Sequence, residues 1–192
     1  MDHGQNFQDN RMHGRRMNEL TLIPPSVDYA EAFLSWRREP IAKKYNPLLQ
    51  LDLNEVKERL SKCHYDLSNL KENEQYRWFI RLKGELVGQV AMSGVNLMMG
   101  TAEIGYTVAE NFHGKGIGTT AVKSLVKKIF NETSLRKIIA IVHEENIASC
   151  KLLEKIGFKR EGLLREHFIV NGDPANEAYY GLLRRECVDV NS

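Results

Sequence analysis

The hydrophobic period of the sequence changes abruptly partway along the chain, and this change limits the possible folds. Trp78, Ile80 and Leu82 alternate with polar neighbours, which is typical of a half-buried β-strand. From Ile117 to Phe130, apolar residues instead recur at steps of three and four, which predicts an amphipathic helix. A chain with both periods must pack helices against a sheet, so the sequence predicts an α/β fold.

Turn residues and these two periods divide the chain into a definite order of elements. In the first part we expect a strand at 20–23, a helix from Ser26 or Asp28 to about Arg38, an irregular connection over 40–53, and a helix capped by Asn54 that continues to Leu70. We then expect strands at 78–82, 86–95 and 101–109, a helix from 115, a strand at 137–142, a helix at 147–156 ended by Gly157, and strands at 158–170 and 176–185. This order predicts a mixed sheet within one α/β domain.

The size and charge of the chain point to one globular domain. The 192 residues, 42% of them hydrophobic, are enough for one substantial core. We therefore expect a single domain at 18–188. Residues 1–17 are polar, and we expect them to form a flexible tail without the apolar core of a secretory signal. The 27 basic and 25 acidic residues nearly cancel, which argues against a nucleic-acid partner.

The cysteines and histidines give no sign of a disulfide framework or a metal site. Cys63, Cys150 and Cys187 are widely spaced, and His143-Glu144-Glu145 lacks the second histidine of H-E-x-x-H. We therefore expect no metal and a reducing, cytoplasmic location. No apolar run is long enough to cross a bilayer, so we expect no membrane partner either.

The segment His113–Thr119 is the most informative part of the chain because it places three glycines between a predicted strand and a predicted helix. Glycines let a backbone approach a ligand closely, and the first turn of a helix presents unpaired N–H groups. This arrangement predicts a phosphate or pyrophosphate site, to whose rim Lys115 can add a charge. Neither the Walker spacing nor the dinucleotide fingerprint fits, because Thr119 stands at the third glycine position. The alternative is a glycine turn without a ligand.

A second group of residues lies at a fitting distance on the next strand and helix. It consists of Asn146, Ser149, Leu152, Gly157 and Phe158. Together, the two segments resemble the acyl-CoA motifs of the GCN5-related N-acetyltransferase (GNAT) superfamily, with His113 in place of the usual Gln or Arg. The likeness covers roughly residues 20–186. Segment 102–106 is similar to the ribosomal-protein N-acetyltransferase branch, and segment 165–176 is similar to that branch and to spermidine acetyltransferases.

The resemblance implies a GNAT-type fold, with a mostly antiparallel sheet of about seven strands, four flanking helices and a splay between the fourth and fifth strands. Strand 101–109 would carry a bulge and diverge from strand 137–142, which opens a V-shaped slot for acetyl-CoA. Its pantetheine arm would bond to backbone groups at 107–109, and its pyrophosphate would bind amides at 114–119. The implied cofactor-binding residues are Thr107, Val108, Ala109, His113, Gly114, Lys115, Gly116, Ile117, Gly118, Thr119 and Asn146.

The chemistry implied is direct attack of a primary amine on the thioester. Glu103 is the candidate general base, and the alternative is a surface or salt-bridged glutamate. Leu153 stands where many GNAT members carry an acidic tyrosine, so Ser149 is the best local substitute for contacting the thiolate. Its alternative role is that of a small residue that permits close helix packing. Tyr106, among other tyrosines, either lines the acceptor slot or packs in the core, and core packing is favoured.

The resemblance also bears on the acceptor and on partners. By analogy with the branch resembled, the preferred acceptor is a protein or peptide N-terminal amine. Small amines such as polyamines or aminoglycosides are the enzymatic alternative, because fold does not settle substrate. A non-catalytic acyl-CoA-binding module is the alternative from another class, and the missing tyrosine supports it. A homodimer is left open.

Overall fold

The computed structural model describes residues 19–45 and 51–191, with side chains through residue 187. The expected flexible tail, residues 1–17, lies outside the described residues. The limits proposed for the domain therefore stay a prediction.

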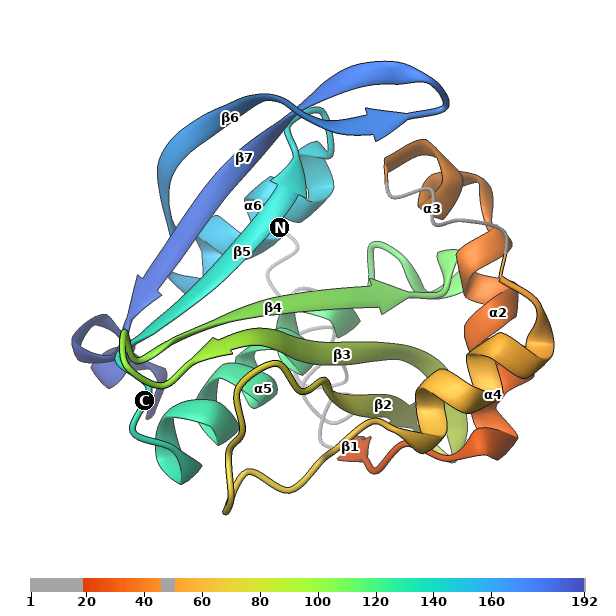
Figure 1. Cartoon of the computed structure of the whole chain (residues 1–192), viewed down its shortest axis with the longest axis horizontal. Coiled ribbons are helices and arrows are strands. Elements are labelled where there is room, and N and C mark those ends of the chain that lie inside the picture. Colours follow the sequence, from red (N-terminus) through yellow and green to blue (C-terminus); the bar gives the residue numbers. More distant parts are fainter. Residues whose placement is uncertain (1–18, 46–50, 192) are drawn as a thin grey trace, which may run out of the picture.

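The described residues form one seven-stranded sheet, which confirms the predicted mixed α/β architecture (Figure 1). Its strands are β1 (Leu20–Ile23), β2 (Tyr76–Leu82), β3 (Glu85–Asn96), β4 (Thr101–Val108), β5 (Lys137–His143), β6 (Lys159–Val170) and β7 (Asp173–Leu183). The spatial order is β1-β2-β3-β4-β5-β7-β6. Neighbouring strands are antiparallel except for β4 and β5, which are parallel.

Helices cover both faces of this sheet. The described residues contain five α-helices, one more than expected: α2 (Ala30–Arg38), α3 (Pro40–Tyr45), α4 (Leu53–Ser61), α5 (Ile117–Glu132) and α6 (Ile147–Ile156). The larger apolar cluster lies between the sheet and α5 and α6, and a smaller one joins α2 and α4 to the opposite face. Alternation along β2 explains the division, because Trp78 and Ile80 belong to the larger cluster and Phe79 to the smaller.

Two expectations for the segment before β2 are wrong. Residues 40–53 were expected to be irregular, yet α3 forms there, with Pro40 at its first position and a Glu110 carboxylate oxygen accepting from Ile41 N at 2.7 Å. Helix α4 is capped by Asp52 rather than by Asn54, in a capping box with Glu55.

Helix α4 also ends at Ser61 instead of continuing to Leu70. Leu67 is only 2% exposed, and Leu70 packs against the same core. Both leucines reach the core from irregular backbone, so their spacing reflects burial and not helical periodicity.

The splay between the fourth and fifth strands is present. Strands β4 and β5 pair only where Thr101–Glu103 face Lys137–Ile139, and Figure 1 shows the two strands diverging beyond this point. The expectation of a bulge in β4 is wrong. The register shift between β3 and β4 places the extra residue in β3, between Ser93 and Asn96. Gly94 of β3 has φ +56°, a conformation that glycine adopts readily and that bulges often use.

Candidate active site

A cavity of about 440 Å³ lies where β4 and β5 have separated. Its walls come from the end of β4, the glycine-rich turn, α6 and the α2–α3 segment. The predicted residues that line it are Thr107, Val108, His113, Gly114, Gly116, Ile117, Gly118, Thr119, Asn146 and Ser149. The fold thus brings both sequence segments to one cavity.

The glycine-rich turn has the geometry of an anion site. Gly114 and Gly116 have φ +71° and +75°, and a Cβ built on either glycine would have no atom within 4 Å. Gly116 is the N-cap of α5 without a side-chain cap, so the first-turn amides are not satisfied within the helix. The positive end of the α5 dipole therefore faces the cavity, an arrangement that favours the binding of a phosphate group.

Gly118 has a different role, in helix packing. A Cβ at this position would lie 2.9 Å from Leu152 Cδ1 on α6. Real Cβ atoms essentially never approach another atom so closely, so a side chain here would require the Leu152 side chain to move. The third glycine therefore leaves room for Leu152 of α6 against the start of α5, along the cavity.

Two predicted residues near the turn, Lys115 and Ala109, lie outside the cavity lining. Lys115 Nζ donates to Asn111 O at 2.7 Å, so its ammonium is directed back at its own loop. Ala109 N donates to Val87 O at 2.9 Å, which leaves that amide unavailable for a ligand. Lys151 and Lys155 of α6 line the cavity instead, and their four-residue spacing on one helix face is the signal that could have identified them.

His113 lines the cavity with one ring nitrogen already engaged. Its Nε2 lies 2.7 Å from Val108 O. Because a carbonyl oxygen can only accept, Nε2 carries the hydrogen and donates to β4. The imidazole thereby ties the turn to the end of the strand, and Nδ1 is the atom left for a ligand.

Asn146 and Ser149 lie together at the start of α6. Asn146 Oδ1 caps the helix by accepting from Ser149 N at 3.1 Å. The Ser149 hydroxyl oxygen lies 2.5 Å from the hydroxyl oxygen of Tyr106, which comes from β4 on the other side of the cavity. Tyr106 also lines the cavity, so core packing does not describe it fully. Burial raises the pKa of Tyr106 to about 12, so its phenol stays protonated at neutral pH.

Comparison with known proteins identifies the family. Residues 19–159, about three quarters of the chain, match the family model of the acetyltransferase (GNAT) domain. The chain belongs to the GNAT acetyltransferases. As a GNAT acetyltransferase, it is an acetyl-CoA-dependent N-acetyltransferase, which confirms the predicted enzyme class and acyl donor.

Three similar proteins illustrate this relationship. An uncharacterized N-acetyltransferase, p20, of Bacillus licheniformis is 29% identical over 168 residues, which cover 87% of this chain and 94% of that protein. A putative ribosomal N-acetyltransferase, YdaF, of Bacillus subtilis is 37% identical over 103 residues, or 54% of this chain and 56% of that one. The structure of spermidine N-acetyltransferase from Vibrio cholerae in complex with CoA and spermine has a TM-score of 0.77 at 23% identity, over 89% of this chain and 99% of that chain. This last likeness shows the fold.

The GNAT acetyltransferase has Leu153 fully buried in the core, at 0% exposure. The position at which many GNAT members carry an acidic tyrosine therefore packs in the larger apolar cluster and does not line the cavity. A hydroxyl nevertheless reaches this part of the cavity, because Tyr106 enters from β4 and meets Ser149.

Glu103 lies where β4 leaves β5, but it does not line the cavity that Ser149 and Tyr106 share. It occupies the face of β4 opposite to the buried Ala102 and Ile104. Burial raises the pKa of its carboxyl group, the nearby Glu177 raises it further, and His167 partly opposes this. His167 Nδ1 lies 2.6 Å from Glu177 Oε2, so the three groups form one cluster.

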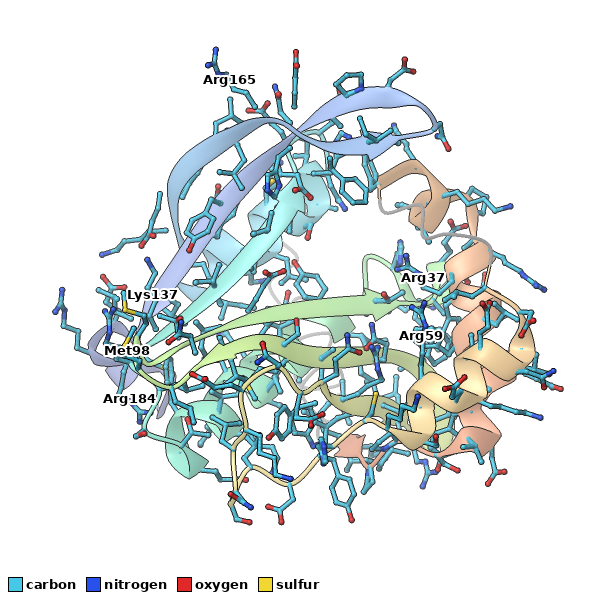
Figure 2. All side chains as sticks on the ribbon, viewed as in Figure 1. Arg37, Arg59, Met98, Lys137, Arg165 and Arg184 are labelled. Atoms are coloured by element: carbon cyan, nitrogen blue, oxygen red, sulfur yellow. The ribbon has the colours of Figure 1, made fainter. Side chains whose placement is uncertain are left out.

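The α2–α3 segment forms the remaining wall of the cavity. Arg37 extends from α2 toward the end of β4 (Figure 2), and Glu39 lines the cavity beside it. Burial raises the pKa of Glu39, although its bond from Glu110 N at 3.1 Å opposes the shift. The rings of Tyr45 and His143 lie 5.3 Å apart and connect α3 to the end of β5.

The structure gives no sign of a metal site or of a membrane-spanning helix within the described residues. Among the described residues, no group of three or more His, Cys, Asp or Glu is placed to hold a metal ion. No helix within the same residues is long and apolar enough to span a membrane.

Proposed function

We propose that this GNAT acetyltransferase transfers an acetyl group from acetyl-CoA directly to the primary amine at the N-terminus of a protein or peptide. The supporting observation is that one cavity connects the uncapped start of α5 to the hydroxyl pair of Tyr106 and Ser149. An anion site at one end and a hydrogen-bond donor at the other match the two ends of an acyl-CoA pantetheine arm.

The proposed binding roles follow this layout. The pyrophosphate binds the amides from Gly114 to Thr119, with Lys151 and Lys155 adding positive charge from α6. The pantetheine arm bonds to backbone groups of Thr107 and Val108, where β4 has lost β5 as a partner. Asn146 contributes its side-chain N–H groups, since its Oδ1 caps α6.

The proposed chemistry requires a base, oxyanion donors and a donor to the leaving sulfur. Glu103 takes the amine proton, directly or through water, and its raised pKa makes it a better acceptor near neutral pH. Backbone N–H groups of β4 beyond Glu103 stabilise the oxyanion at little reorganisation cost. The Ser149 hydroxyl donates a hydrogen bond to the sulfur as the thioester bond breaks.

The charges near the cavity favour a peptide over a polyamine. Arg37 lines the cavity, and the guanidinium of Arg77 lies close enough to Arg37 to lower the pKa of Arg37 further, after the larger effect of burial. Arg77 donates to Gln89 Oε1, and Gln89 donates to Thr107 Oγ1 at 3.3 Å. Arginine N–H groups bind peptide carbonyl oxygens but repel the several cations of a polyamine.

A small cationic amine is the second candidate acceptor. It is favoured by Glu103 and Glu177. These residues place two carboxylates close together on the face of β4 and β7 opposite to the buried Ala102 and Ala178. A third candidate function is a module that binds acyl-CoA without transferring the acyl group. It is supported by Leu153, an apolar residue at the position where many GNAT members carry an acidic tyrosine.

An acceptor panel tests the proposal. CoA thiol release would be followed with a peptide carrying a free N-terminus, the same peptide blocked at its N-terminus but containing lysine, spermidine, and an aminoglycoside. Saturable release with the free N-terminus alone is the expected result. Saturable release with spermidine and none with the peptide would assign the small-amine function. Tight CoA binding without transfer to any acceptor would favour the binding module.

We also propose a cytoplasmic location. Cys63, Cys150 and Cys187 are all free thiols, as expected in a reducing compartment. Fractionation of cells that express the tagged protein would test the location.

A further inference from the structure

The hydroxyl groups of Tyr106 and Ser149 meet across the cavity from two elements that are far apart in sequence. Tyr106 belongs to β4 and Ser149 to the first turn of α6, and their oxygen atoms are 2.5 Å apart. Both residues line the cavity. The pair therefore lies where one wall of the splayed sheet faces the helix that carries the proposed donor to sulfur.

The direction of this hydrogen bond follows from the chemistry of the two groups. Either hydroxyl can donate in this pair, but a phenol is the stronger acid and an aliphatic hydroxyl oxygen is the better acceptor, which favours Tyr106 as the donor and Ser149 as the acceptor. The backbone carbonyl oxygen of Ser149 also lies 3.4 Å from the Tyr106 hydroxyl oxygen, but the side-chain oxygen Oγ is much closer, at 2.5 Å. Because the pKa of Tyr106 is raised to about 12, it keeps its proton through the neutral range.

We propose that Tyr106 is a positioning residue that fixes the Ser149 hydroxyl hydrogen toward the sulfur of the acyl donor. With one lone pair of Ser149 Oγ occupied by Tyr106, the serine hydrogen must point elsewhere, and the cavity is the open direction. The bond from the phenol also polarises the serine O–H and makes it a better donor. This inference rests on the proposed transfer from acetyl-CoA, and it replaces the missing tyrosine of α6 with one from β4.

The balance of the step is simple. As the thioester C–S bond breaks, its electron pair stays on sulfur, and the Ser149 O–H donates a hydrogen bond to the developing negative charge. The proton lost by the amine passes through the base to solvent, and the thiolate takes one proton from solvent. Neither Tyr106 nor Ser149 changes its protonation state over the cycle.

The first test needs no acceptor. The thiol of CoA bound to the enzyme is titrated by the ultraviolet absorbance of its thiolate, in wild type, Tyr106→Phe and Ser149→Ala. A hydrogen bond to the thiolate lowers the thiol pKa, and we expect both variants to return it toward the value of free CoA by about one unit. An unchanged thiol titration in a Tyr106→Phe protein that binds CoA normally would overturn the inference. Failure of wild type to bind CoA would instead reject the proposed function, and with it the inference.

The second test uses turnover with any active acceptor. A hydrogen bond to a charged group contributes roughly 1.5–3 kcal/mol, so each variant should lower kcat by about ten- to a hundredfold with little change in KM for acetyl-CoA. The double variant should lose no more than Ser149→Ala alone, because both changes remove one oriented hydrogen bond. Losses that multiply in the double variant would contradict the inference.

A matched control separates this effect from the general loss of a phenol. Tyr29 accepts a hydrogen bond from Arg81 at 3.2 Å and lies outside the cavity lining. Tyr29→Phe should leave kcat and the CoA thiol titration unchanged. Thermal unfolding of each variant shows whether it is folded at the assay temperature.

Discussion

Glu103, the proposed general base, is partly buried at the point where β4 leaves β5. Burial, and then the carboxylate of Glu177, raises its pKa, so the group holds a proton more strongly than an exposed glutamate. As a base it acts in the ionised form. The rate constant kcat/KM should therefore fall as the pH drops through this raised pKa, which lies above the ordinary value for glutamate.

Replacing Glu103 tests this role. Glu103→Gln should lower kcat by about a hundred- to ten-thousandfold and abolish the acidic limb of the pH profile, because general-base catalysis contributes on this scale. The comparison variant is Glu39→Gln, which removes a carboxylate that lines the cavity and also has a raised pKa. A larger loss in Glu39→Gln, with an intact acidic limb in Glu103→Gln, would move the role to Glu39.

Gly116 and Gly84 form a pair that separates ligand binding from backbone strain. Their φ angles are +75° and +88°, and an added Cβ would have no atom within 4 Å at either position. Alanine at either position should cost about 1–2 kcal/mol of unfolding free energy, because an L-residue is strained there. Only Gly116→Ala should weaken acetyl-CoA binding, by about tenfold or more, since its methyl group sits at the first-turn amides. Calorimetric titration and denaturant unfolding measure both effects, and equal weakening in Gly84→Ala would disprove the assignment.

At the scale of elements, the start of α4 depends on one carboxylate. Asp52 accepts from Glu55 N at 2.8 Å, and the Glu55 side chain accepts from Asp52 N at 2.8 Å. Asp52→Ala should lower the free energy of unfolding by about 1 kcal/mol, whereas Asn54→Ala should change it little. Urea denaturation of both variants measures the difference. A larger effect at Asn54 would restore the cap expected from the sequence.

The sequence predicts best those elements whose pattern is complete within a short window. Helix α5 shows its apolar face over four turns, and α6 ends at Gly157, whose φ of +106° demands glycine. Helix α3 has six residues and is held by Glu110, 69 residues away from Ile41, so no local pattern reveals it. The apolar spacing after Ser61 is misleading because Leu67 is buried without being helical.

The same distinction applies to the site. The glycine-rich turn is predictable because its backbone conformation demands particular residues locally. Tyr106 and Ser149 are 43 residues apart and meet only because β4 and α6 face each other across the splay. The cavity positions of Lys151 and Lys155 likewise depend on how α6 packs beside α5, which no local pattern shows.

At the scale of the whole molecule, Arg184 lies near the end of the sheet where β4 and β5 still pair (Figure 2). Its guanidinium donates to Leu135 O at 2.8 Å, to Thr133 O at 2.6 Å and to Phe130 O. These bonds join the chain after β7 to the last turn of α5 and to the connection between α5 and β5, so they fix the segment that leads into β5.

Arg184→Met should therefore destabilise the fold without touching the cavity. The change leaves three carbonyl groups without their charged donor, and we expect a loss of about 2–4 kcal/mol of unfolding free energy. The exposed neighbour Arg185 is the control, and Arg185→Met should change stability by less than about 0.5 kcal/mol. Denaturant unfolding measures both, and equal losses would show that the Arg184 hydrogen bonds to α5 and the α5–β5 connection do not stabilise the fold.

The short pairing of β4 with β5 leaves both strands with bare edges inside the molecule. Beyond Glu103 and Ile139, each strand continues for several residues, and no strand within the described part of the chain pairs with it on the side that faces the other. Unpaired strand edges can form backbone hydrogen bonds with another extended chain, and most proteins protect them. The acyl donor, with its two amide groups, would take the place of a missing strand. Ligand-free protein should therefore exchange its β4 amide hydrogens faster and associate more readily on storage than protein kept with CoA.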